Sequence, residues 1–214
     1  MKTENTLLDY NLQHCLLKDS KFDIKAIAIK HRIPCFGYVI EEQDQAGTFN
    51  VEKAKELGIP PGPLYGKLKS GENIFINNQE IKPEQVLGDP IKGRKIVILG
   101  DTCDTSEMIP FCQNADYVIH EATMENSLRE KAIEYGHSTP EMAAEFSVKI
   151  NARKLVLFHV SPRYKPIEDD DNENAESAKV LLLEAENYLS KHQANHIKVL
   201  VAEDFLEDTI ERKK

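Results

Sequence analysis

Three short apolar runs in the second half of the chain each lead into ionisable residues. The runs and the residues after them are Ile96 to Leu99 before Asp101, Tyr117 to Ile119 before His120 and Glu121, and Leu155 to Phe158 before His159. Their length and branched side chains are typical of buried β-strands. Ligands gather at the carboxyl ends of strands in open α/β sheets, because loops converge there while the sheet stays rigid. The runs therefore predict an α/β fold with one site at an edge of its sheet.

Helical and extended patterns on either side of these runs complete the predicted α/β unit. Helices are expected over 125–135, 140–150 and 174–191, and further strands over 22–30, 36–40 and 197–201. Gly136 is the expected C-cap of the first helix, and Thr139 is the expected N-cap of the second. Residues 1–21 carry only weak structural signals.

The segment between about residues 41 and 94 differs from the rest, because its apolar runs are short and scattered. Asn50 predicts the start of a short helix over 51–57, which Gly58 ends. The run from Pro60 to Lys67 is rich in Pro and Gly and is expected to be an irregular, exposed connection. We therefore expect an excursion from the core of a single domain that spans residues 1–214.

The composition of the 214 residues suits one sizeable core, since 41% of them are hydrophobic. No apolar run approaches the roughly 18–20 residues of a membrane span, and the N-terminus lacks the apolar stretch of a signal peptide. We therefore expect a cytoplasmic or nuclear protein. The net charge is −9, but residues 168–214 hold 13 acidic and 6 basic residues and so account for −7 of it. Charge thus permits a nucleic-acid partner without indicating one.

The ionisable residues at the strand ends have the chemistry of a metal site. His31 follows the strand expected over 22–30, so imidazoles and carboxylates from several strands could meet at one edge. Histidine and aspartate without cysteine are the ligands of hydrolytic Zn²⁺ or Mn²⁺ sites. Spacing alone leaves a second interpretation open, in which isolated polar residues cap the strand ends.

Ordered motifs along the chain resemble those of ribonuclease Z, the tRNA 3′-processing endonucleases of the metallo-β-lactamase fold. In chain order they are His31-Arg32-Ile33-Pro34, Pro60-Pro61-Gly62-Pro63, Gly100-Asp101-Thr102, His120-Glu121-Ala122-Thr123, His137-Ser138-Thr139 and His159-Val160-Ser161-Pro162-Arg163-Tyr164. The likeness runs from about residue 22 to 210, and the short form of the enzyme is the nearest match. It implies a metallo-β-lactamase-type αββα sandwich with a protruding arm at about 41–94.

The resemblance also implies which residues carry the chemistry. His31 would bind one zinc ion, His159 a second, and Asp101 would bridge the two, with Mn²⁺ as an alternative metal. His137, oriented by Glu121, would contact the scissile phosphate and help to protonate the departing 3′ oxygen. The implied activity is zinc-dependent endonucleolytic removal of the 3′ trailer from precursor tRNA.

The implied substrate contacts lie on the arm. Gly62, Pro63, Lys67 and Lys69 would sit where the arm clamps the tRNA, and the two lysines suit contacts with phosphates. The resemblance implies precursor tRNA as the partner, without DNA or a membrane, and a homodimer.

One family motif is missing from this chain. The HxHxDH motif of the first half of the fold has no counterpart, because the seven histidines include no HxH pair. We therefore expect a chain that corresponds to the C-terminal part of the enzyme and lacks its N-terminal half. The alternative is a non-catalytic module that binds tRNA or dimerises with an intact partner. A third hypothesis is a hydrolase of a small ester or thioester.

Overall fold

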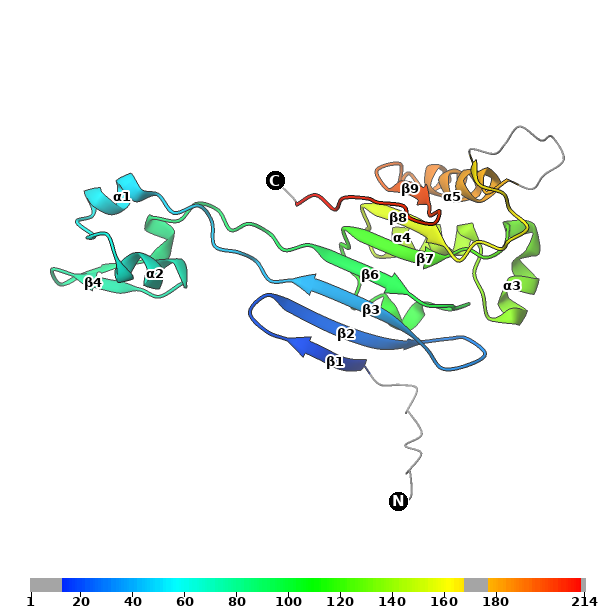
Figure 1. Cartoon of the computed structure of the whole chain (residues 1–214), viewed down its shortest axis with the longest axis horizontal. Coiled ribbons are helices and arrows are strands. Elements are labelled where there is room, and N and C mark those ends of the chain that lie inside the picture. Colours follow the sequence, from blue (N-terminus) through cyan, green and yellow to red (C-terminus); the bar gives the residue numbers. More distant parts are fainter. Residues whose placement is uncertain (1–12, 168–176, 213–214) are drawn as a thin grey trace, which may run out of the picture. The chain divides into compact units, whose positions relative to one another are not determined.

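The computed structural model describes residues 13–167 and 177–212 and divides the chain into two compact units (Figure 1). The sheet unit comprises Met1–Glu42 and Arg94–Ile210, and the small unit comprises Gln43–Gly93 and Glu211–Lys214. Within the described residues, no helix is both long enough and apolar enough to cross a lipid bilayer.

A seven-stranded mixed sheet forms the centre of the sheet unit, in the order β1-β2-β3-β6-β7-β8-β9. The strands are β1 Gln13–Lys18, β2 Phe22–Ile29, β3 Cys35–Glu42, β6 Lys95–Leu99, β7 Tyr117–Glu121, β8 Lys154–Phe158 and β9 Lys198–Val201. Strands β1 to β6 pair antiparallel, and β6 to β9 pair parallel. The six strands expected from the sequence are confirmed. Strand β1 was missed because its side chains are almost all exposed, so no apolar alternation marks it.

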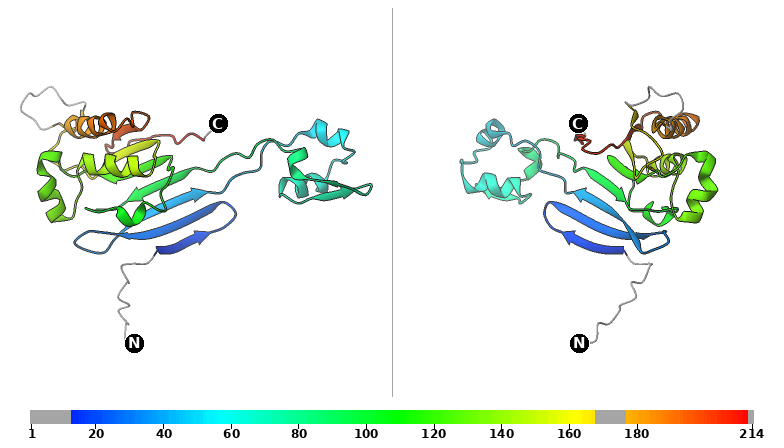
Figure 2. Two further views of the ribbon diagram at one scale, coloured as in Figure 1. Left: turned by 180° about the vertical axis from the view of Figure 1, so that it is seen from behind. Right: turned by 45° about the vertical axis from the view of Figure 1, so that its right-hand side comes forward.

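The helices α4 and α5 lie on one face of the sheet, which Figures 1 and 2 show from opposite sides. The helices of this unit are α3 Arg129–Tyr135, α4 Pro140–Lys149 and α5 Lys179–Lys191, with short 3₁₀ turns η2 Ser106–Met108 and η3 Asn126–Leu128. Gly136 ends α3 in the left-handed conformation, as expected. Of the helix expected over 174–191, residues 174–176 lie outside the described part of the chain. The predicted α/β class is confirmed.

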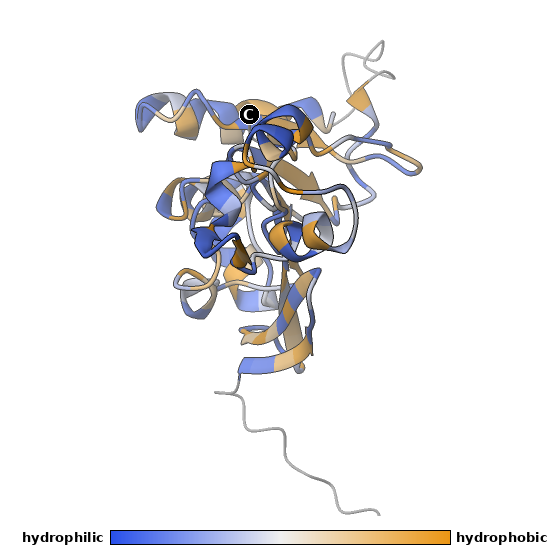
Figure 3. Cartoon of the chain, turned by 90° about the vertical axis from the view of Figure 1, so that its left-hand side faces the viewer, coloured by the Kyte–Doolittle hydropathy of each residue, from blue (hydrophilic) through white to orange (hydrophobic). Residues whose placement is uncertain are grey.

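Both faces of the sheet are apolar. The core between sheet and helices contains Val97, Leu99, Val118, Leu155 and Leu157 from the strands, with Phe146, Leu181 and Leu189 from the helices. The opposite face carries a row of cross-strand neighbours, Tyr38, Ile98, Ile119, Val156 and Leu200. Figure 3, coloured by hydropathy, shows orange segments along these strands.

The segment after β9 contributes contacts to the rim of this opposite face. The Asp208 carboxylate accepts a hydrogen bond from the Tyr117 hydroxyl at 2.8 Å and pairs with Lys154 Nζ at 2.7 Å. Burial, together with this carboxylate, raises the pKa of Tyr117 to about 12. Tyr117 is therefore a neutral hydrogen-bond donor throughout the physiological pH range.

The small unit has its own core. Its elements are α1 Val51–Glu56, α2 Pro63–Lys69, β4 Ile74–Ile76, β5 Gln79–Ile81 and the 3₁₀ turn η1 Pro83–Gln85. Its buried hydrophobic cluster consists of Ala54, Ile59, Leu68, Ile74, Ile81 and Val86. The predicted first helix is confirmed, because the Asn50 side chain accepts the Lys53 amide hydrogen bond at 3.0 Å and caps α1.

The prediction that residues 60–67 are irregular is wrong from Pro63 onward, where α2 begins. Proline is tolerated at the first helical position, because the amide it lacks would have no partner there. Leu68 is completely buried in the core of the small unit, and this packing stabilises a short helix despite Gly66 in its interior. The β4–β5 hairpin was not predicted; Asn77 and Asn78 turn it with φ values of 48° and 63°.

The buried position of Leu157 at the centre of the parallel strands gives a test of this core. Leu157→Ala is expected to lower the free energy of unfolding by about 2–5 kcal/mol, because it leaves a cavity between sheet and helices. Leu183→Ala on α5, where the side chain is 47% exposed, is the matched control and is expected to cost less than about 0.5 kcal/mol. Urea denaturation of both variants measures the difference. Equal losses would contradict the assigned core.

Candidate metal centre

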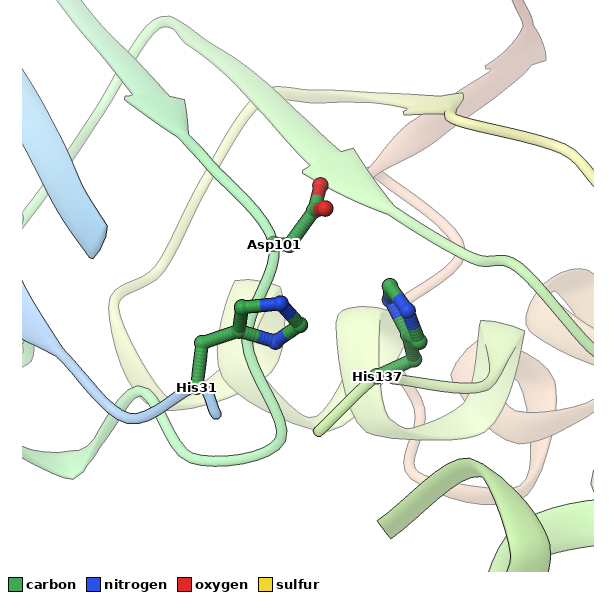
Figure 4. Close-up of side chains that lie close together, drawn as sticks. All are labelled: His31, Asp101 and His137. Atoms are coloured by element: carbon green, nitrogen blue, oxygen red, sulfur yellow. The ribbon is translucent and has the colours of Figure 1, made fainter. Parts of the chain in front are cut away.

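Three side chains from distant parts of the sequence meet at the carboxyl edge of the sheet (Figure 4). His31, Asp101 and His137 each offer a ligand atom, and these atoms lie within 4.8 Å of one another. His159 joins them through Asp101, since its Nε2 is 3.7 Å from Asp101 Oδ2. The rings of His137 and His159 are stacked, with centroids 5.4 Å apart. We call these four residues the edge cluster.

His31 is oriented by the end of helix α3. Its Nδ1 lies 2.7 Å from the Gly136 carbonyl oxygen. Because a carbonyl only accepts hydrogen bonds, Nδ1 carries the proton and Nε2 keeps a free lone pair. Gly136 has a φ of 81°, and a Cβ there would lie 2.6 Å from His31 Nδ1. Glycine at this position therefore permits both the left-handed cap and the close approach of the imidazole.

The loop that carries Asp101 is tied to the loop that carries His31. The Thr102 hydroxyl donates to the Lys30 carbonyl at 3.0 Å, and the Cys103 amide donates to the same oxygen at 2.9 Å. Lys30 directly precedes His31 and Thr102 directly follows Asp101. These bonds therefore hold both cluster residues in register across the sheet edge.

His137 is oriented by a carboxylate that is completely buried. Glu121 Oε1 lies 3.0 Å from His137 Nδ1 and accepts the Thr102 amide hydrogen bond at 2.8 Å, while the Thr123 hydroxyl lies 2.7 Å from Oε2. A buried negative charge needs such partners, since losing water costs several kcal/mol. As in His31, the proton on Nδ1 leaves Nε2 of His137 available.

His159 sits in a strained backbone conformation. It follows β8 and has a φ of 55°, the left-handed region that non-glycine residues adopt at a cost of about 1–2 kcal/mol. The Thr123 hydroxyl lies 3.1 Å from its carbonyl oxygen, and the Ser161 amide donates to the Thr123 carbonyl at 3.3 Å. These contacts hold the imidazole beside Asp101 while leaving 45% of the side chain exposed.

His120 lies apart from the edge cluster. Strand β7 continues to Glu121, so His120 is inside the strand, only 1% exposed, and packs against Phe146 of α4. Burial lowers the pKa of its imidazole, which is therefore neutral near pH 7. The neighbouring Glu121 reaches the site instead.

Known proteins match this chain over nearly its full length. "Zinc phosphodiesterase ELAC protein 1" of Mus musculus is 42% identical over 204 residues, which are 94% of this chain and 55% of that protein. "Ribonuclease Z" of Archaeoglobus fulgidus is 40% identical over 206 residues, which are 93% of this chain and 62% of that protein. No model of a protein family matches the sequence.

A solved structure agrees with these sequence matches. The crystal structure of human tRNase Z, short form (ELAC1), superposes with a TM-score of 0.52 and 27% identity, over 94% of this chain and 48% of that one. The chain is related to ribonuclease Z. The predicted metallo-β-lactamase-type fold is confirmed for the part of the fold that the chain contains. The chain spans about half the length of the relatives it matches.

The edge cluster fits the zinc that the name of the mouse relative implies. Its donors are imidazole nitrogens and a carboxylate, the ligands of hydrolytic zinc sites. Two of its imidazoles, His31 and His137, hydrogen-bond an oxygen through Nδ1, the arrangement that orients histidine ligands in zinc proteins. Of the three ligands expected from the ribonuclease Z resemblance, His31 and Asp101 lie in the group whose ligand atoms are within 4.8 Å of one another, and the third member of that group is His137. The expected ligand His159 adjoins the group through Asp101.

The four residues expected to contact substrate all belong to the small unit. Gly62 is the N-cap of α2, and Pro63, Lys67 and Lys69 lie in that helix. Lys67 is exposed. Lys69 Nζ is 5.4 Å from the centroid of the Phe49 ring, which itself packs on Tyr65. A cation held over an aromatic ring keeps its charge exposed to a polyanion.

The Gly136 contact predicts that zinc affinity depends on a residue with no ligand atom in its side chain. Gly136→Ala is expected to weaken zinc binding at least tenfold, because the methyl group displaces the His31 imidazole. Gly71→Ala is the matched control, since Gly71 has a similar φ of 87° but no atom within 4 Å of a Cβ. This control is expected to bind zinc as tightly as the parent chain. Competition with a chromophoric chelator measures the zinc affinity of both variants. Equal affinity of the Gly136 variant and the control would contradict this role.

Proposed function

We propose that this chain carries the substrate-facing half of a zinc-dependent endoribonuclease that removes the 3′ trailer from precursor tRNA. The observation that carries the proposal is the edge cluster, which includes the glutamate-backed His137, in a chain that is 40–42% identical to zinc phosphodiesterase ELAC protein 1 and ribonuclease Z. The names of these relatives give the reaction class, and the cluster supplies residues that suit it.

The metal-binding residues divide between two ions in this proposal. His31 would hold one ion and His159 a second, and Asp101 would be the ligand that the two ions share. When bound, a zinc pair polarises a phosphodiester and supplies hydroxide at neutral pH. The hydrogen bonds that the Thr102 hydroxyl and the Cys103 amide donate to the Lys30 carbonyl hold His31 and Asp101 in place without the metal.

His137 is the proposed proton donor. Its Nδ1 is hydrogen-bonded to the Glu121 carboxylate, so its Nε2 can face the departing 3′ oxygen of the RNA. The buried carboxylate stabilises the protonated imidazole and fixes its tautomer, as an aspartate does for the histidine of a catalytic triad. A positioned acid of this kind contributes about 10²- to 10⁴-fold to the rate.

The edge cluster is too small for two complete zinc sites. Catalytic zinc ions each have about three protein ligands, and His31, His159 and the shared Asp101 supply fewer, since His137 is the proposed proton donor. The apolar row from Tyr38 to Leu200 offers a surface on which further sheet could pack. These observations favour the second candidate function, a non-catalytic module that binds tRNA or dimerises with an intact partner.

The small unit is the proposed tRNA-binding part in both candidates. Lys67 and Lys69 would contact phosphates, which positions RNA without reading its sequence. A homodimer belongs to the same proposal, on the strength of the ribonuclease Z resemblance. The cytoplasmic or nuclear location that the sequence predicts is part of the proposal too.

Zinc content and RNA cleavage separate the two candidates. The endonuclease is expected to retain zinc after dialysis and to release the trailer from a precursor tRNA; Asp101→Ala is expected to lose most of the zinc and at least about 10²-fold in rate. Asp89→Ala in the small unit is the control that removes an exposed carboxylate elsewhere. RNA binding with neither zinc nor cleavage would favour the module. Absence of both RNA and zinc binding would contradict both candidates.

Glu121→Gln tests the proton-donor assignment. The amide oxygen can still accept from Thr102 and His137, so the fold and the zinc content are expected to persist. The rate is expected to fall about 10- to 100-fold, because the variant loses the charge that stabilises a protonated His137. Plasma emission spectrometry measures the zinc, and single-turnover cleavage measures the rate. A zinc-depleted variant would show that Glu121 supports the metal instead.

A further inference from the structure

A guanidinium and an aromatic ring lie together beside the edge cluster. Arg32 directly follows His31, and its Cζ is 5.6 Å from the centroid of the Tyr135 ring. Tyr135 is the last residue of α3, two positions before His137. Both side chains are exposed, Tyr135 to 39%. We call them the Arg32–Tyr135 pair.

The pair is attached to the same backbone contact that orients His31. A Cβ on Gly136 would lie 3.2 Å from the Arg32 backbone nitrogen as well as 2.6 Å from the His31 ring. The backbone at Arg32 therefore lies close to the backbone at Gly136, which directly follows Tyr135. Since His31 also hydrogen-bonds the Gly136 carbonyl, the pair is held in position relative to the cluster.

Within residues 13–167 and 177–212, the charge of Arg32 has no acidic partner. Among the residues that the structure describes, no carboxylate lies within 4.0 Å of its guanidinium, whereas Arg94 pairs with Glu42 and Arg153 with Asp116. An aromatic face holds a guanidinium in place without neutralising it. The planar group then keeps the two parallel N–H donors that match the oxygens of a phosphate.

We propose that Arg32 binds the phosphodiester next to the one that is cut, with Tyr135 holding the guanidinium in the orientation that this contact needs. The inference rests on the proposed endonuclease function, because it needs an RNA strand passing over the edge cluster. Arg32 is a positioning residue in this role. It fixes where the strand lies and leaves the proton transfer to His137.

Salt-dependent RNA binding by the full 214-residue chain tests the pair. The probe is a fluorescent precursor tRNA with a 3′ trailer, compared with the same tRNA without it. Arg32→Gln is expected to weaken binding roughly tenfold at low salt and to reduce the slope of log K against log salt by about 0.7, the value for one phosphate contact on a single strand. Thermal melting checks that each variant is folded.

Three further variants make the result specific. Arg32→Lys is expected to keep the salt slope, because it keeps the positive charge. It is expected to lose about threefold in affinity, because an ammonium group lacks the two parallel N–H donors of the guanidinium. Tyr135→Leu is expected to weaken binding with the slope unchanged. Lys191→Gln is the charge-matched control: this exposed residue ends α5, which leads into the amino end of β9, away from the edge cluster. It is expected to bind like the parent chain.

The outcomes distinguish this inference from the proposed function. An effect of Arg32→Gln only on the tRNA with a trailer places the contact on the trailer side of the cut, and an equal effect on both places it on the mature side. If Arg32→Gln binds like Lys191→Gln while the parent chain binds RNA, the pair has no such role and the proposed function stands. If the parent chain fails to bind either RNA, both are wrong.

Discussion

The buried carboxylate of Glu121 is the contact on which the rest of the site depends. It accepts the Thr102 amide beside Asp101, orients His137, and lies within hydrogen-bond distance of the Thr123 hydroxyl, which also approaches the His159 carbonyl. A fully buried charge is stable only when such donors surround it. The same hydrogen bonds that stabilise Glu121 therefore hold three members of the edge cluster at one place.

The sheet explains why the cluster is found at one edge. Its parallel strands β6 to β8 end together, so Asp101, Glu121 and His159 arrive side by side, and β2 brings His31 from the antiparallel half. The opposite face of the sheet is as apolar as a core face, and the relatives of known name are about twice as long.

Much of the fold could be predicted because apolar runs report burial directly. Strands β6, β7 and β8 carry apolar side chains on both faces, so they form continuous apolar segments in the sequence. Strand β1 and the β4–β5 hairpin were not predicted. They are extended because they pair with a neighbouring strand, and their own residues show no alternation of apolar and polar side chains that would indicate a strand. Helix α2 was misread because the burial of Leu68 outweighs the low helix propensity of its glycine.

The sequence by itself determined the ionisable residue types, their places at strand ends, and the caps of α1 and α3. Only the tertiary structure decided which histidines meet. His31 and Gly136 are 105 positions apart, and no local pattern encodes their contact. His120 and Glu121 are adjacent, yet successive side chains of a strand point to opposite faces, so one enters the helix-covered core and the other reaches the site. Packing of the whole sheet, a sum over distant residues, sets that outcome.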